Sequence, residues 1–187
     1  MISMAPPEFK IRAHLFKAFY LFFLGGAEKS MSCIRTAADL AEKEKSDYRY
    51  AADWLKAWIY YSLGDFEQAK KDNEDWFAAL AKAVSAIPRP TQILRLFLDG
   101  LISLGQERSD VSKSDLREIS SLSLDPSISN FPGTQERVRF EREWLRAMIA
   151  LHENSYDDAV EILGDPEIAG RVPDSGYINL FNWIRHN

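Results

Sequence analysis

Two stretches of this chain carry the same residue pattern far apart in the sequence, and this internal repeat constrains the fold more than any other feature. Residues 53–69 read DWLKAWIYYSLGDFEQA, and residues 143–159 read EWLRAMIALHENSYDDA. The two share a Trp-Leu pair, an Ala three residues after the Trp, and a second Ala at the end. Units of this length bury their apolar surface by stacking on neighbours rather than by folding alone. The sequence therefore predicts a stack of similar units.

The pattern also extends to other parts of the chain. Residues 14–30 match the second unit at an offset of 39 residues, and residues 93–106 match it more loosely. The matched pairs are Ala18 with Ala57, Gly25 with Gly64, Leu104-Gly105 with Leu63-Gly64, and Trp183 with Trp144. We expect one domain over residues 1–187, with units at 11–45, 48–86, 91–124 and 134–164 and a terminal helix at 175–187.

Small residues and turn signals indicate that each unit is a pair of antiparallel helices. Ala57 and Ala147 are small enough to let a partner helix approach closely. Gly64 ends the first helix of its unit, because glycine adopts the left-handed cap conformation at little cost. Ser112 and Asp115 have the spacing of a capping box, which predicts a helix from there to about Leu122.

Residues 50–82 resemble a tetratricopeptide repeat. The residues at that family's spacing are Ala57, Tyr60, Gly64, Phe66 and Ala69, and in the fourth unit Ala147, Asn154, Tyr156, Ala159 and Leu163. The resemblance implies an all-α fold, a right-handed superhelical stack of about four antiparallel helix pairs with a final C-terminal helix. The period exceeds the about 34 residues usual for the family, so a related helical-repeat family is an alternative.

The resemblance further implies that the first helix of each unit lines a concave face that binds partners. The implied positions are Arg12, Leu15, Phe19, Phe22 and Phe23; Trp54, Trp58, Tyr61 and Ser62; Gln92, Arg95, Asp99 and Ser103; and Glu141, Trp144, Met148, Leu151 and His152. The candidate peptide-binding residues among them are Phe19, Phe22, Phe23, Trp54, Trp58, Tyr61, Trp144 and Met148. Two alternatives are core packing by these residues and cover by the chain's own tail or a second copy.

An aromatic groove of this kind suits an apolar or amphipathic peptide, so we expect a protein-binding module with an adaptor or co-chaperone role. A structural or regulatory segment of a larger multidomain protein is the alternative, and a homodimer through the apolar groove is a further one. Some tetratricopeptide domains clamp a chaperone's carboxylate with Lys and Asn. Leu15, Phe19 and Leu55 stand at those positions here, so we expect no such binding.

Composition and motifs argue against several other classes. The net charge is −5 and the pI about 5.3, which disfavours nucleic-acid binding. Cys33 is the single cysteine, so neither an internal disulfide nor a zinc site of paired cysteines can form. The three histidines have no second His at metal-ligand spacing, and no phosphate loop or nucleophile motif is present. We expect no enzyme activity, cofactor or metal.

The N-terminal segment allows two interpretations of where the protein resides. No apolar run reaches the about 18 residues that span a bilayer. Basic residues precede the apolar stretch 18–24 and small residues follow it, as in a secretory signal. That stretch also belongs to the repeat, so we expect a cytoplasmic protein, with a secreted or periplasmic one as the alternative. Because the repeat pattern stops inside a fifth unit, either a helix caps the stack or the chain is a fragment.

Overall fold

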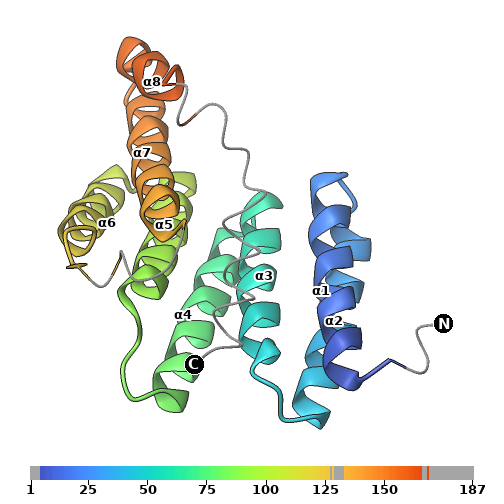
Figure 1. Cartoon of the computed structure of the whole chain (residues 1–187). Helices are drawn as coiled ribbons and strands as arrows, with labels where there is room; N and C mark the ends of the chain where they lie inside the picture. The colour runs from blue at the N-terminus through green and yellow to red at the C-terminus, as the bar shows by residue number, and fades with distance from the viewer. Residues whose placement is uncertain (1–4, 127, 129–132, 166–167, 169–187) are drawn as a thin grey trace. The chain divides into compact units, whose positions relative to one another are not determined.

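A computed structural model describes residues 5–126, 128, 133–165 and 168 of the chain, and these residues form helices and no strand (Figure 1). The helices are α1 Pro7–Phe23, α2 Ala27–Lys43, α3 Tyr48–Ser62, α4 Phe66–Ala83, α5 Arg89–Gly105, α6 Ser109–Leu122, α7 Thr134–His152 and α8 Tyr156–Leu163. Short turns join them into four successive antiparallel pairs, so the predicted all-α fold of helix pairs is confirmed. The expected terminal helix at 175–187 lies outside the described residues.

The chain divides into two compact units at the end of α4, and each has the packing of a helical repeat. In the first unit, α2 packs against both α1 and α3, and α1 also contacts α3. In the second unit, α5 packs against α6 and α7, α6 contacts α7, and α7 packs against α8. Within the units, α3 and α7 thus each pack on both helices of the pair before them. A single domain and a right-handed superhelix stay predictions.

Each pair carries two small residues at equivalent places, one on each of its helices. These residues are Ala18 with Ser30, Ala57 with Ala69, Gly100 with Ser112, and Ala147 with Ala159, and all are buried. In two pairs the contact is a hydrogen bond: Ser30 Oγ donates to the Ala18 carbonyl oxygen at 2.6 Å and Ser112 Oγ to that of Gly100 at 2.8 Å. Such bonds form only where two helix backbones lie close, which requires small side chains.

The register of the third unit differs from the sequence alignment. Leu104-Gly105 was aligned with Leu63-Gly64, but α5 continues through Gly105 and the left-handed residue is Glu107, at φ 60°. Gly64 and Asn154 hold the same place in their units, at φ 76° and 61°. When Glu107 is aligned with Gly64 and Asn154, the third unit moves two residues later than the alignment on Gly105 places it. In this register, the residues equivalent to the predicted concave-face positions are Leu94, Phe97, Leu101 and Gly105 in place of Gln92, Arg95, Asp99 and Ser103.

The predicted capping box in the third unit is also wrong. Helix α6 begins at Ser109, so Ser112 and Asp115 lie inside it. The Ser112 hydroxyl does not cap a helix end, because it is buried and bonded to the carbonyl oxygen of Gly100. Ser112 therefore donates its hydrogen bond across the helix pair, and the capping-box spacing of Ser112 and Asp115 does not mark the start of a helix.

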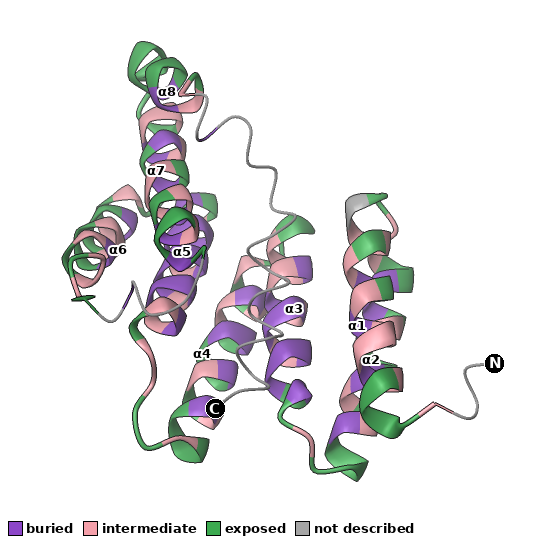
Figure 2. Ribbon diagram, in the orientation of Figure 1, coloured by how far each residue is buried: buried purple, intermediate pink, exposed green. Residues whose placement is uncertain are grey.

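Burial follows the faces along which the helices meet. Figure 2 shows buried residues along the sides of α3 and α5, with exposed residues concentrated at the turns and on the outer helix faces. Helix α5 has buried residues in every direction, as expected for a helix that is apolar all round. The apolar segment that resembles a signal lies largely in α1, where Ala18 is fully buried. Among the described residues, no helix is long and apolar enough to cross a membrane.

Candidate functional site

The predicted binding residues other than Phe23 occupy three places that repeat in every pair, counted from the small residue of the first helix. Three residues before it stand Leu15, Trp54, Phe97 and Trp144; one residue after it stand Phe19, Trp58, Leu101 and Met148; and four residues after it stand Phe22, Tyr61, Leu104 and Leu151. These spacings put the three places on one face of a helix. In α5 all three are buried, so the third pair offers no exposed surface there.

Helix α3 carries a continuous row of aromatic rings, which we call the aromatic row: Trp54, Trp58, Tyr61 and, at the start of α4, Phe66. The ring centroids lie 6.0 Å apart from Trp54 to Trp58, 5.8 Å from Trp58 to Tyr61 and 6.0 Å from Tyr61 to Phe66. The first two contacts are edge-to-face, an arrangement that aromatic quadrupoles favour. The row joins the two helices of the second pair through their turn.

The rings of the aromatic row differ in their exposure to solvent. Trp54 is 1% exposed, so its ring supports Trp58 from within. Trp58 and Tyr61 are half-buried, and burial raises the pKa of the Tyr61 phenol. A neutral phenol and an indole that keep part of their surface in water, while held by neighbouring rings, are suited to cover an apolar group.

Helix α1 adds aromatic residues in the same unit. Phe19 and Phe22 are half-buried, and the Phe19 ring meets Tyr20 edge-to-face at 6.3 Å. The side chain of Phe23 lies outside the described residues. Arg12, seven residues before Phe19, is on the same face of α1. Because α1 contacts α3, the unit brings these phenylalanines and the aromatic row into one helix bundle.

The two remaining predicted residues belong to the second unit. Trp144 of α7 is 36% exposed, and its ring contacts that of Phe140, with 5.5 Å between the ring centroids. Met148, one turn further, is half-buried. Phe140 was not among the predicted residues, although its spacing of four from Trp144 places the two rings together on a helix.

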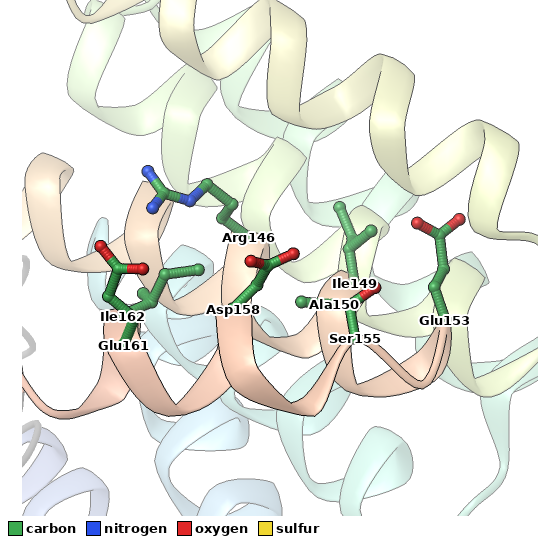
Figure 3. A pocket seen from close by; sticks show the side chains of 8 residues that line it. All are labelled: Arg146, Ile149, Ala150, Glu153, Ser155, Asp158, Glu161 and Ile162. Atoms are coloured by element: carbon green, nitrogen blue, oxygen red, sulfur yellow. The ribbon is translucent and has the colours of Figure 1, made fainter.

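A groove between α7 and α8 is a second candidate that the sequence did not reveal. It holds two adjoining hollows of about 290 and 270 Å³. Ile149 and Ile162 form its apolar floor. Figure 3 shows Arg146 on α7 with Asp158 and Glu161 on α8 around the first hollow. Arginines at positions 139, 142 and 146, spaced by three and four residues, were the available sequence signal.

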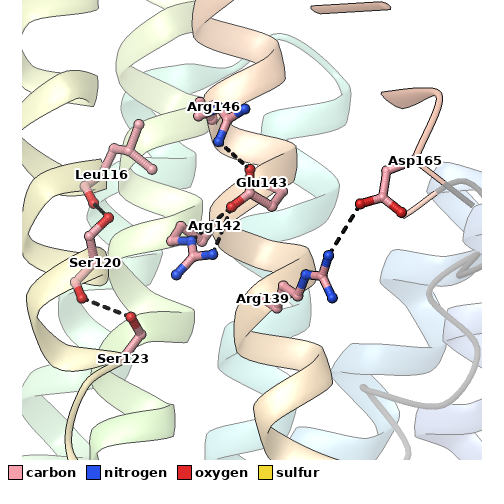
Figure 4. A network of polar contacts seen from close by, with 8 residues as sticks. All are labelled: Leu116, Ser120, Ser123, Arg139, Arg142, Glu143, Arg146 and Asp165. Carbon is pink, nitrogen blue, oxygen red and sulfur yellow. Dashed lines mark hydrogen bonds and ion pairs between the residues drawn. The ribbon is translucent and has the colours of Figure 1, made fainter. Parts of the chain in front are cut away.

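The three arginines of this groove are each paired with a carboxylate. Glu143 accepts from Arg142 Nε at 2.9 Å and forms an ion pair with Arg146 Nη1 at 2.7 Å. Arg139 pairs with Asp165 at 3.2 Å, as Figure 4 shows beside the serine hydrogen bonds of α6. An anionic ligand would have to displace these contacts to reach the arginines.

In the second unit, the pKa values of two carboxyl groups are raised to about 7. Burial raises the pKa of Glu141 to about 7, against the opposing effect of Arg137, whose Nε lies 3.4 Å away. Burial and the charges of Asp99 and Glu118 raise the pKa of Asp115 to about 7. Neither Glu141 oxygen has a hydrogen-bond partner among the described residues. Glu141 is buried and Asp115 half-buried, so both groups affect stability.

Within the described part of the chain, no group of three His, Cys, Asp or Glu side chains could hold a metal ion. Cys33 is a half-buried free thiol. No family model, curated protein or solved structure matches this chain.

Proposed function

We propose that this chain is a protein-interaction module of the tetratricopeptide type, and that its first unit binds an apolar or amphipathic peptide over the aromatic row. The observation that carries this proposal is the continuous row of rings on α3, with Trp58 and Tyr61 half-exposed above a buried Trp54. Rigid aromatic side chains lose little conformational freedom on binding, which makes them frequent hot spots.

The chemistry of the partner follows from the residues around the row. Phe19 and Phe22 add apolar surface on α1, and Arg12 adds a positive charge on the same face. An amphipathic segment with aliphatic or aromatic anchors suits this surface, and an acidic residue in it would face Arg12. The role is that of an adaptor or co-chaperone in the cytoplasm, where a free thiol such as Cys33 is ordinarily kept reduced.

The test is a selection of peptides from a phage-displayed random library on the immobilised full chain, followed by affinity measurement of the selected peptides. The proposal expects peptides with apolar anchors at helical spacing, and a loss of affinity of at least about tenfold in a Trp58→Ala chain. A Leu124→Ala chain is the matched control, because Leu124 is strongly exposed and lies outside the aromatic row.

Circular dichroism must show that each variant is folded, since Trp58 is half-buried. Peptides that bind wild type and Trp58→Ala equally well would place binding elsewhere and overturn the proposal. A library that yields no peptide for the wild-type chain would count against peptide binding as such.

A further inference from the structure

The half-buried arginines of this protein differ in whether the chain itself supplies a partner for their charge. The described chain has four of them: Arg12, Arg95, Arg137 and Arg142. Three form ion pairs with carboxylates, Arg95 with Asp99 at 3.0 Å, Arg137 with Glu141 at 3.4 Å, and Arg142 with Glu143 at 2.8 Å. The side chain of Arg12 forms no ion pair or hydrogen bond among the described residues.

The sequence around Arg12 explains the difference. Residues four apart are neighbours on a helix surface, and Arg95 and Arg137 each have a carboxylate four residues later. At that place, Arg12 has Phe16. Glu8 lies four residues before Arg12, but it is exposed and forms no ion pair with Arg12 in the described structure. The guanidinium of Arg12 is therefore available to an acceptor from outside the described chain.

A half-buried guanidinium favours an acceptor that carries a negative charge. Arginine stays protonated in proteins at every physiological pH, so Arg12 cannot adapt to its surroundings by losing its charge. A carboxylate can accept two parallel N–H···O bonds from one guanidinium, and such charge-assisted bonds are stronger than neutral ones. A carboxylate is thus the acceptor that suits Arg12 best.

The backbone of α1 fixes where this charge lies in relation to the aromatic site. Ile11 and Leu15, on either side of Arg12 in the sequence, are fully buried and hold the helix in place. Arg12 precedes Phe19 by seven residues, so the two lie on one face of α1, about 10 Å apart along the helix axis. A ligand that covers Phe19 with an apolar residue therefore reaches Arg12 about two helical turns away.

We propose that Arg12 determines the specificity of the peptide site, and that it selects peptides with an Asp or Glu side chain about two helical turns from the apolar residue that covers Phe19. The inference rests on the proposed function and specifies the ligand of that site as an acidic amphipathic segment. Amphipathic peptides of the same shape that are neutral or basic at this position bind more weakly.

The test uses a library of helical peptides in which leucines stand at fixed helical spacing and every other position is Glu, Gln or Lys. Selection on the full chain is expected to enrich Glu at a position about two turns from a leucine. Replacing that Glu by Gln in the selected peptide is expected to weaken binding about fivefold.

Two substitutions at Arg12 show whether its charge is the cause. An Arg12→Gln chain is expected to bind the Glu and Gln peptides equally, since the pair is then lost from both sides of the comparison. An Arg12→Glu chain is expected to select Lys at the same position of the peptide. Reversal of the selected charge is an outcome that a merely structural role of Arg12 would not produce.

Two control variants leave Arg12 in place. Arg35 of α2 is exposed and lies outside the aromatic site, so an Arg35→Gln chain is expected to keep the full preference for Glu. A Trp58→Ala chain is expected to bind both peptides more weakly by the same factor, which keeps the preference and separates this test from that of the aromatic row.

Three results would overturn the proposal. Equal binding of the Glu and Gln peptides to the wild-type chain would do so while leaving peptide binding itself intact, whereas a library without any binder would overturn both proposals. The third result concerns stability. The described chain supplies no partner for Arg12, so Arg12→Gln is expected to unfold at the same urea concentration as wild type. A lower midpoint would mean that the chain itself pairs with this charge.

Discussion

Leu145 of α7 packs directly on Gly100 of α5, so closely that a Cβ atom at position 100 would lie 2.7 Å from Leu145 Cδ2. Leu145 is fully buried, and Gly100 also accepts the hydrogen bond from Ser112. One glycine thus allows the approach of both the partner helix α6 and the following helix α7. The contact shows why a helix interior keeps a residue that by propensity alone is unfavourable there.

We predict that Gly100→Ala destabilises the protein. Helix propensity favours alanine by about 1 kcal/mol, but the added Cβ overlaps a buried leucine, and overpacking costs about 1–3 kcal/mol. The net loss in the free energy of unfolding is expected to be about 1 kcal/mol, measured by urea denaturation. In a Leu145→Ala background the overlap is absent, so Gly100→Ala is expected to be neutral or stabilising there. Equal effects in both backgrounds would refute the contact as the cause.

Ser30→Ala and Ser112→Ala test the hydrogen bonds that close the first and third pairs. Each change removes a buried hydroxyl donor, and each loss is expected to cost about 1 kcal/mol in the free energy of unfolding. The cost stays small because Ala69 and Ala159 occupy this place in the other two pairs without strain. Ala69→Ser is the reciprocal variant. A cost of several kcal/mol for either serine would mean that its hydroxyl has a further role.

Substitutions at two equivalent turn residues are predicted to change the free energy of unfolding in opposite directions. Gly64 has φ 76° with nothing within 4 Å of its added Cβ, so Gly64→Ala is expected to lose about 1 kcal/mol through backbone strain alone. Asn154 has φ 61° at the same place, so Asn154→Gly is expected to be neutral or to gain a few tenths of a kcal/mol. Thermal unfolding of the two variants beside wild type measures both. Destabilisation by Asn154→Gly would show that the asparagine side chain contributes more than its backbone.

These turns also show how far the sequence predicts the fold. Gly64 indicates a turn in the sequence, because the left-handed backbone conformation favours glycine. The helices on either side of it could therefore be predicted. Glu107 adopts the same left-handed conformation, but a glutamate does not indicate a turn. Gly105 does suggest a turn in the sequence, yet it lies within helix α5. The sequence pattern therefore places the third unit two residues out of register. Packing on both sides of α5 decides where its helix ends, and a local pattern does not contain that information.

The candidate site shows the same limit. Periodicity places Trp54, Trp58 and Tyr61 on one helix face, and the structure has their rings in contact. Which ring is covered depends on neighbouring helices, so the burial of Trp54 could not be read from spacing.

The buried carboxyl of Glu141 makes the stability of the second unit depend on pH near neutrality. The folded pKa is about 7, above the 4.5 of an exposed glutamate, because burial disfavours the charged form. The folded state therefore binds the proton more tightly than the unfolded state does. The resulting stability is fully present below pH 4.5 and is lost as the pH rises through 7.

We predict that the Glu141 carboxyl alone lowers the free energy of unfolding by about 1 kcal/mol between pH 6 and pH 8, and that Glu141→Gln removes this part of the dependence. Glutamine keeps the shape of the side chain but carries no charge at either pH. Asp115, with its own pKa raised to about 7, adds a dependence of the same sign, so Glu141→Gln/Asp115→Asn is the control in which the profile becomes flat. Urea denaturation at the two pH values measures the change. If Glu141→Gln leaves the wild-type pH profile unchanged, the Glu141 carboxyl is ionised in the folded protein, and Arg137 stabilises its charge more than burial penalises it.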